Sequence, residues 1–313
     1  MKKNNIIALF GTLIGLTLAV MTSGCTKIIE EIASQPVAPV DYQQTTPTGG
    51  NLERKYIANG PYAVSKKENP VLQEFEKYTI YYPTSLESES RKYPVIVLCN
   101  GSGTPMSKYS TVANHFASWG FIVIGTEENY SWNAFGAEMS LCYLERWNEN
   151  EMIEETQSIF YQKVDFDNVG VVGHSQGGIG VINAITNTDH KDTYKAAVSL
   201  SPTNKELANN LLWNYDATKV DIPIMLIAGE GGGDDWVLTL EQMQEIYTDI
   251  PSAKMMARRK GTVHNEVLYM ANGYVVAWFM WQLQGDTEAA NAFIGTSPEI
   301  TTNSYYTDTQ SSL

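Results

Sequence analysis

The sequence has few cysteines and few positive charges for its length. Only three cysteines occur among 313 residues, too few for the disulfide framework typical of small secreted domains. Lysine and arginine number 21 against 35 aspartates and glutamates, so the formal net charge is −14. A surface of this sign repels phosphate backbones and anionic headgroups, so we expect neither nucleic acid nor an anionic membrane surface as a ligand.

The N-terminus carries an apolar run, Ile6 to Val20, behind two lysines. The run is short for a transmembrane span, and a basic start before an apolar core is typical of an export signal. The stretch "MTSGC" that closes it resembles a bacterial lipobox, with Cys25 as the lipidated first residue of the mature chain. We predict a lipoprotein-type signal peptide over residues 1–24, export, and membrane attachment only through lipid on Cys25. An ordinary signal peptide with an incidental cysteine is the alternative.

Composition divides the rest of the chain into three parts. Residues 25–50 are rich in Pro, Thr, Gln and Gly, which suits a flexible linker. Residues 296–313 form a polar tail without an apolar period, and residues 51–295 between them, with no repeat or second linker, are expected to form one domain. Cys99 falls in an apolar run and is expected in the core; a bridge to Cys142 is possible, but nothing in the sequence supports it.

Short apolar runs alternate with helical stretches along the predicted domain. After the first, the runs are near-continuously apolar, as in a buried parallel sheet; they read YTIYYP, PVIVLC, FIVIGT, NVGVVG, KAAVSLS and IPIMLIAG. Helices are expected at residues 107–119, 134–161, 176–187, 239–249 and 271–284. This alternation predicts an α/β domain with a mostly parallel central sheet flanked by helices, and a site at the carboxyl ends of the strands.

The stretch "VGVVGHSQGG", residues 169–178, has the pattern of a nucleophile elbow. In G-x-S-x-G, here Gly173 to Gly177, a sharp turn between strand and helix exposes the serine oxygen, and the glycines leave room for neighbouring backbone. The apolar strand before the motif and the helical sequence after it supply the required context. Ser175 is therefore the candidate nucleophile, and a plain glycine-rich turn is the alternative.

Four histidines are candidates for the base that would accept the proton of Ser175. His115 falls on a helix, His174 belongs to the turn with its side chain directed away from the serine, and His190 lies in a polar loop. His264 lies in a loop before the last helix. The chain order of this fold, serine then acid then histidine, selects His264.

The acid that orients the histidine should follow the run IPIMLIAG. Glu230, Asp234 and Asp235 are the candidates there. Glu230 comes directly off the strand, so we prefer Asp234, with Asp235 as the next choice. The "GGGDD" segment is also a weak, unrepeated match to a calcium loop.

Two backbone donors should stabilise the oxyanion. One is the N–H of Gln176, at the N-terminus of the helix after the elbow, where amide groups lack helical partners. The other is expected from the glycine-containing loop "NGSGT", which follows the run PVIVLC.

Taken in order, these motifs resemble bacterial cutinases and related polyester hydrolases of the α/β-hydrolase superfamily, with a wider similarity to dienelactone hydrolase- and chlorophyllase-type enzymes. The resemblance extends from about Gly60 to Phe293, through GPYAVS, HFASWGFIVI, GHSQGG, YKAAVSLSPT and GTVHNEV. It implies an α/β-hydrolase fold over residues 51–295 and hydrolysis of esters through an acyl-enzyme.

The resemblance also implies a role for each site residue. Ser175 is the nucleophile, His264 the base and Asp234 the acid. The backbone N–H groups of Ser102 and Gln176 form the oxyanion hole. It implies no cofactor and no metal.

Three departures make the expected acyl cleft more polar than in that family. Thr203 stands where an aromatic follows the SP pair, Gln176 where methionine is common, and Asn265 where an aromatic follows the histidine. Trp132 and Trp236 could supply aromatic walls or be ordinary packing residues. Thr203 and these two tryptophans are therefore the candidate substrate-cleft residues.

We expect a monomeric serine carboxylic-ester hydrolase. Only the short segment Thr203–Ile222 separates two successive strands, so no large lid is expected, and the open cleft suits extended polymeric or carbohydrate-linked esters. Two alternatives remain: a non-catalytic surface lipoprotein that uses the fold as a binding module, and an acyltransferase or peptidase with the same triad.

Overall fold

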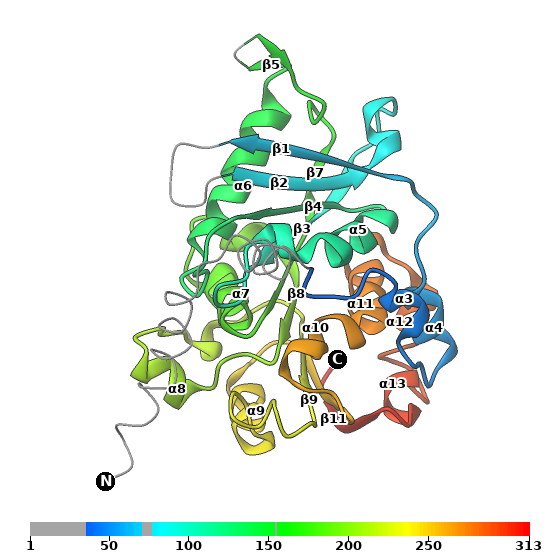
Figure 1. The fold of residues 1–313 in the computed structure, drawn as a ribbon, viewed down its shortest axis with the longest axis vertical. Helices are drawn as coiled ribbons and strands as arrows, with labels where there is room; N and C mark the ends of the chain where they lie inside the picture. Colours follow the sequence, from blue (N-terminus) through cyan, green and yellow to red (C-terminus); the bar gives the residue numbers. More distant parts are fainter. Residues whose placement is uncertain (1–35, 71–76, 154) are drawn as a thin grey trace, which may run out of the picture. The chain divides into compact units, whose positions relative to one another are not determined.

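A nine-stranded sheet runs through the structure from β1 to β11 (Figure 1). The structure is a computed structural model that describes residues 36–70, 77–153 and 155–313. Residues Val37–Leu313 belong to one unit. The predicted signal peptide, the lipidation site Cys25 and the first part of the predicted linker lie outside the described residues.

The sheet has the order β1-β2-β4-β3-β7-β8-β9-β10-β11. Its strands are β1 (Val64–Pro70), β2 (Lys77–Pro83), β3 (Tyr93–Cys99), β4 (Ile122–Thr126), β7 (Val164–His174), β8 (Tyr194–Leu200), β9 (Ile224–Gly229), β10 (Lys254–Arg259) and β11 (Tyr306–Ser311). The six strands from β4 to β10 pair in parallel, and β1, β2 and β11 pair antiparallel at the two edges. The predicted α/β-hydrolase fold with a mostly parallel sheet is confirmed.

Helices cover both faces of the sheet. One core contains residues of α3 (Tyr42–Thr45), α4 (Asn51–Ile57), α5 (Ser110–Ser118), α10 (Val267–Met270), α11 (Asn272–Gln284), α12 (Thr287–Ala290) and α13 (Glu299–Thr302). The other contains residues of α6 (Phe135–Glu149), α7 (Gln176–Thr186) and α9 (Leu240–Asp249). The segment between β8 and β9 holds only the short α8 (Lys205–Asn210) and the 3₁₀-helix η5 (Ala217–Lys219), so it forms no large lid.

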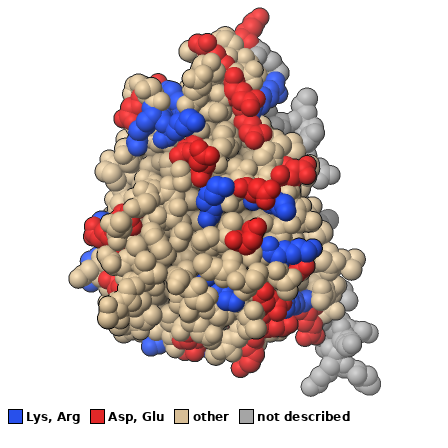
Figure 2. All heavy atoms as spheres, turned by 180° about the vertical axis from the view of Figure 1, so that it is seen from behind, with Lys and Arg blue, Asp and Glu red and all other residues tan. Residues whose placement is uncertain are grey.

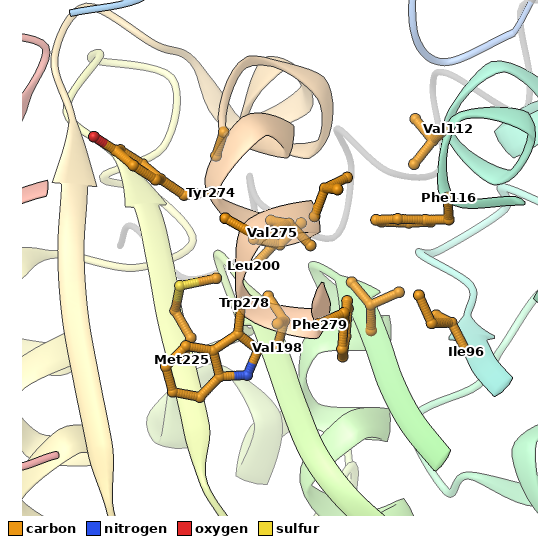
Figure 3. Close-up of a cluster of buried hydrophobic side chains, with 14 of the residues drawn as sticks. Ile96, Val112, Phe116, Val198, Leu200, Met225, Tyr274, Val275, Trp278 and Phe279 are labelled. Carbon is orange, nitrogen blue, oxygen red and sulfur yellow. The ribbon is translucent and has the colours of Figure 1, made fainter. Parts of the chain in front are cut away.

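The two cores exist because side chains on a strand alternate between faces. In β3, Ile96 belongs to the core with α11, whereas Val95 and Val97 belong to the opposite one. Figure 3 shows Val275, Trp278 and Phe279 of α11 beside Val198 and Leu200 of β8. This apolar helix is buried against the sheet, as its nearly all-round hydrophobic sequence predicts.

The helix expected over residues 134–161 is shorter than predicted. Helix α6 ends at Glu149, and residues 150–161 instead contain a small hairpin of β5 (Met152–Ile153) and β6 (Thr156–Gln157). Asn148 Oδ1 accepts a hydrogen bond from the N–H of Val164 at 3.0 Å, and Asn150 Nδ2 donates to the carbonyl of Arg146 at 2.8 Å. Such asparagine bonds to the main chain compete with helix continuation.

The prediction of a flexible linker is wrong from residue 37 onward. Tyr42, on α3, is fully buried. Its hydroxyl lies 2.8 Å from Nδ1 of His115 and accepts a hydrogen bond from Nδ2 of Asn272 at 2.6 Å. Ala38 is also buried, and the N–H of Val37 donates to the carbonyl of Lys108 at 2.8 Å, so the segment packs on the domain although its overall composition is that of a linker.

The C-terminal boundary predicted at residue 295 is also wrong. Residues 306–311 form β11, which pairs antiparallel with β10. Arg259 of β10 lies 2.6 Å from Glu53 of α4 and 3.0 Å from the hydroxyl of Tyr306 in β11, and the two charged side chains are each 1% exposed. Strand pairing and polar contacts therefore join the tail to the domain. A segment that is held in this way needs no apolar period, so its sequence did not predict the contact.

Cys99 is buried and Cys142 half-buried, and neither forms a disulfide.

Among the described residues, no helix has the length and apolar character that crossing a bilayer requires. Figure 2 shows acidic and basic side chains interspersed over one face of the described part of the chain.

Candidate active site

Ser175 lies in a sharp turn between β7 and α7, where the sequence places it. Its backbone angles are φ 60° and ψ −120°, a conformation that non-glycine residues rarely adopt. Its N–H donates to the carbonyl of Leu200 at 2.9 Å, and its own carbonyl accepts from Gly178 at 2.9 Å and Thr203 at 3.3 Å. These bonds hold the strained residue, whose side chain is partly exposed.

The two outer glycines of the motif are required by close backbone contacts. A Cβ atom on Gly173 would lie 2.2 Å from the carbonyl oxygen of Gly177. A Cβ atom on Gly177 would lie 2.2 Å from the carbonyl oxygen of Cys99, in the neighbouring strand β3. Both distances are far inside van der Waals contact, so only glycine fits this turn.

His264 is oriented by Asp234. His264 begins the 3₁₀-helix η6 (His264–Glu266), and its Nδ1 lies 2.6 Å from Oδ1 of Asp234, which is fully buried. A carboxylate accepts, so the proton of the imidazole is on Nδ1 and Nε2 is left able to take one from a donor. The pair has the geometry of a base with its orienting acid.

The second carboxylate oxygen of Asp234 is also fully engaged. It accepts hydrogen bonds from the N–H of Gly229 at 2.6 Å and from Oγ of Ser201 at 2.9 Å. Ser201 is fully buried, directly after β8. Ser201 was not among the residues predicted from the sequence, where its position at the carboxyl end of an apolar strand is its only signal.

The other two acids considered from the sequence do not contact His264. Asp235 is exposed, with its carboxylate 3.7 Å from Arg258. Glu230 is exposed as well. Of the three carboxylates after β9, the structure brings only Asp234 to the imidazole.

His174 contacts the main chain and the ring of His264. It is buried, its Nε2 donates to the main-chain carbonyl of His264 at 2.8 Å, and the two ring centroids are 4.5 Å apart. Burial and the neighbouring His264 ring lower the pKa of His174 to about 3. His174 is therefore neutral at physiological pH, and its contact fixes the loop that carries His264.

The expected oxyanion loop is held from both sides. Gly101 donates its N–H to the hydroxyl of Tyr109 at 2.8 Å, and Nδ2 of Asn100 donates to the carbonyls of Thr126 and Glu128. Ser102, which follows, is exposed. Its backbone N–H thus belongs to a loop anchored immediately before it.

The side chain of Gln176 is buried although its backbone begins α7. Its Oε1 accepts from the N–H of Ser131 at 2.8 Å, in the loop after β4 that also carries Trp132. In the described part of the chain, the backbone N–H groups of Ser102 and Gln176 donate to no protein acceptor. Both are therefore available to a ligand, and the glutamine side chain fixes the neighbouring loop.

The three candidate cleft residues differ in exposure. Trp236 is 60% exposed, and its ring centroid lies 5.9 Å from that of His264. Trp132 is half-buried. Thr203 is 3% exposed, so it offers almost no surface to a substrate, because the turn after β8 packs it under the elbow.

The remaining histidines lie elsewhere. His115 is buried, and its Nε2 donates to the carbonyl of Ala58 at 2.8 Å, so it is a structural residue of α5. His190 lies just before the 3₁₀-helix η4 (Lys191–Thr193), between the carboxylates of Glu138 and Glu145. The partners of both histidines given above lie outside the elbow.

Several known proteins are similar to this chain over most of its length. A family model described as PET hydrolase-like matches residues 39–311. The chain is 24% identical to a cutinase of Thermobifida fusca over 288 residues, which cover 88% of this chain and 87% of that protein. It is 26% identical to cutinase est2 of Thermobifida alba over 258 residues, 77% of this chain and 75% of that one.

A third relative is named for its substrate, a terephthalate ester. The chain is 24% identical over 216 residues to a bis(hydroxyethyl) terephthalate hydrolase of Streptomyces coelicolor, which cover 66% of this chain and 60% of that protein. The match to the family model extends past residue 295 to residue 311, so it includes all of β11.

Proposed function

Since the chain belongs to the PET hydrolase-like family and is a carboxylic ester hydrolase, we propose that it cleaves esters through the triad Ser175, His264 and Asp234. The observation that carries this proposal is the 2.6 Å contact between Nδ1 of His264 and Asp234, combined with the strained elbow at Ser175. That contact leaves Nε2 of the imidazole as a proton acceptor, which a serine nucleophile needs.

In the first half of the reaction, Oγ of Ser175 attacks the carbonyl carbon of the ester and its proton passes to Nε2 of His264. The carbonyl oxygen becomes an oxyanion, which accepts hydrogen bonds from the backbone N–H groups of Ser102 and Gln176. The tetrahedral intermediate then expels the alcohol, which takes the proton from His264 and leaves an acyl group on Ser175.

In the second half, water replaces the alcohol. His264 takes a proton from the water as it attacks the acyl carbonyl, and the same two N–H groups hold the second oxyanion. Collapse returns the proton to Ser175 and releases the carboxylic acid. Asp234 remains ionised and stabilises the imidazolium in both halves.

Labelling with a fluorophosphonate tests the nucleophile directly. The wild-type chain should be labelled at Ser175 and should hydrolyse p-nitrophenyl butyrate, and Ser175→Ala should lose both properties with unchanged thermal unfolding. Ser88→Ala, which removes an exposed hydroxyl after the 3₁₀-helix η2 (Thr84–Glu87), is the matched control. An unlabelled wild-type chain without esterase activity would instead support a binding module.

We further propose that an apolar part of the substrate lies along Trp236 and Val263. Trp236 is 60% exposed beside the His264 ring, and Val263, which precedes His264, is 40% exposed. Exposed apolar side chains at a reacting centre favour contact with an extended apolar or aromatic ester. The names of the relatives, cutinases and a terephthalate-ester hydrolase, are consistent with such substrates.

Substrate length separates this role from a structural one. Trp236→Ala should raise KM for p-nitrophenyl octanoate several-fold and leave kcat/KM for the acetate nearly unchanged. Ile294→Ala, which truncates an exposed apolar residue after α12, is the control. Equal losses on both esters would refute a contact with the acyl chain.

Export of the chain as a lipoprotein is proposed from the N-terminal sequence alone, since residues 1–35 are not described. In a bacterial host, Cys25→Ser should abolish incorporation of labelled palmitate and shift the protein from the membrane fraction. Unchanged fractionation without lipid labelling of the wild type would contradict the anchor.

A further inference from the structure

Three metal-ligating side chains from two distant parts of the chain converge at the end of α7 opposite the elbow. Glu138 and Cys142 lie four residues apart on α6 and therefore share a face of that helix. His190 comes from the loop after α7. One carboxylate oxygen, the sulfur and one ring nitrogen all lie within 4.8 Å of one another.

We propose that Glu138, Cys142 and His190 bind a divalent transition-metal ion of the zinc type. Thiolate, imidazole and carboxylate are together the donors that Zn²⁺ prefers, and three protein ligands leave a fourth tetrahedral position for water. Within the described residues, no other three side chains of these kinds lie close enough together to share an ion. The 11-residue α7 spans about 16 Å, so the ion would lie well away from Ser175.

Hydrogen bonds already orient two of the three ligands. Oε1 of Glu138 lies 2.6 Å from Nδ1 of His190, and the other carboxylate oxygen accepts from the backbone N–H of His190 at 3.1 Å. An ion between Oε1 and Nδ1 replaces the proton that they share. The backbone contact would keep the carboxylate in place as this happens.

Glu145 contacts the second nitrogen of the His190 imidazole. Its carboxylate lies 3.1 Å from Nε2 of His190, the nitrogen opposite the proposed ligand atom. With the ion on Nδ1, Nε2 carries the proton and donates to Glu145. Carboxylates that accept from the free nitrogen of a ligating histidine recur in zinc sites, where they fix the ring and increase its basicity.

Charge and access also suit a cation. The side chains of His190 and Glu138 are 18% and 17% exposed, so an ion can enter from solvent without unfolding the helix. The carboxylates of Glu138 and Glu145 lie on either side of the His190 ring, so the site gathers negative charge. A divalent cation would offset this charge and allow the thiol to lose its proton.

The sequence alone led to the expectation of no bound metal. Glu138 and Cys142 lie within a helical stretch, and His190 follows a different helix, so no short ligand motif links the three. The alternative that the geometry allows is an ion-pair cluster without metal, in which His190 bridges two carboxylates and Cys142 takes no part. Cobalt spectroscopy separates the two readings, because it reports on the sulfur.

Titration of Co²⁺ into the full chain carrying Cys25→Ser tests the site, because only the thiols of Cys99 and Cys142 then remain. We expect one Co²⁺ per chain with a thiolate-to-cobalt charge-transfer absorption, which Zn²⁺ displaces. Cys142→Ser should abolish the absorption, and Cys99→Ala should retain it. An absorption that is absent, or that survives Cys142→Ser, would overturn the proposal.

Acid variants on the same helix test the remaining ligands. Glu138→Gln should weaken Co²⁺ binding more than tenfold and Glu145→Gln about tenfold, whereas Glu149→Gln, at an exposed position on α6, should leave it unchanged. Zn²⁺ should raise Tm of the wild-type chain and not that of Cys142→Ser. Circular dichroism checks each variant, and Cys142→Ala replaces the serine variant if that one is unfolded. Equal zinc-dependent shifts of Tm in the wild type and the folded Cys142 variant would refute the metal site and support the ion-pair cluster without metal.

Discussion

Replacing Asp234 by asparagine should reverse the tautomer of the catalytic imidazole. Two donors, the N–H of Gly229 and Oγ of Ser201, face Oδ2 of Asp234 at 2.6 and 2.9 Å. The backbone N–H cannot turn away, so the asparagine oxygen must occupy that side and its NH₂ group must face Nδ1 of His264. A donor there requires Nδ1 to accept, which puts the ring proton on Nε2, where the proton of Ser175 has to go.

The size of the effect follows from the loss of the base. An aspartate-to-asparagine change that inverts the imidazole tautomer in a serine triad lowers kcat by about 10⁴-fold. At about 1.4 kcal/mol for each factor of ten, this corresponds to about 5.5 kcal/mol of lost transition-state stabilisation. Turnover of p-nitrophenyl butyrate measures it, with thermal unfolding as a check that the variant is folded.

Asp235→Asn is the matched control for the same loop. Asp235 is exposed and its carboxylate lies 3.7 Å from Arg258, so kcat should change less than about twofold. If Asp234→Asn retained more than a tenth of the wild-type kcat, or if Asp235→Asn were the more damaging change, the assignment of the acid would be refuted.

Three further predictions test the elbow, the buried ion pair and a buried histidine. Gly177→Ala places a Cβ 2.2 Å from the carbonyl of Cys99, so we expect loss of ester hydrolysis and a Tm lower by several degrees; a fully active, equally stable variant would contradict the close approach. Glu53→Ala leaves the charge of Arg259 buried and unpaired, which should cost about 3–5 kcal/mol in urea unfolding, and a loss below about 1 kcal/mol would show that the ion pair does not hold α4 against β10. Burial lowers the pKa of His115 to about 4, below its ordinary value near 6.5, so the native state binds fewer protons than the unfolded state between these values and the free energy of unfolding falls as pH falls through this window. His115→Gln should flatten that slope by about 1 kcal/mol per pH unit between pH 6 and 5, and unchanged slopes would show that this histidine is protonated in the native state.

Much of the fold could be predicted because its signals are local. Near-continuous apolar runs separated by helical stretches give the parallel strands, and the glycines around Ser175 give the elbow, since steric contact within one turn requires them. His264 could be selected by chain order alone. The catalytic roles of these residues stay predictions until the variants are measured.

The positions of the acid, the two ends and the metal-ligating group depend on contacts between residues far apart in the chain. Asp234 and Asp235 are adjacent and chemically identical, and only the loop's packing directs one to His264 and the other to solvent. The linker and the tail have the composition of polar segments, yet a few buried side chains, among them Tyr42, Ile300 and Tyr306, and the pairing of β11 with β10 attach them. A side chain's direction and its distant partner are set by the packing of the whole domain, and neither leaves a periodic pattern in the sequence.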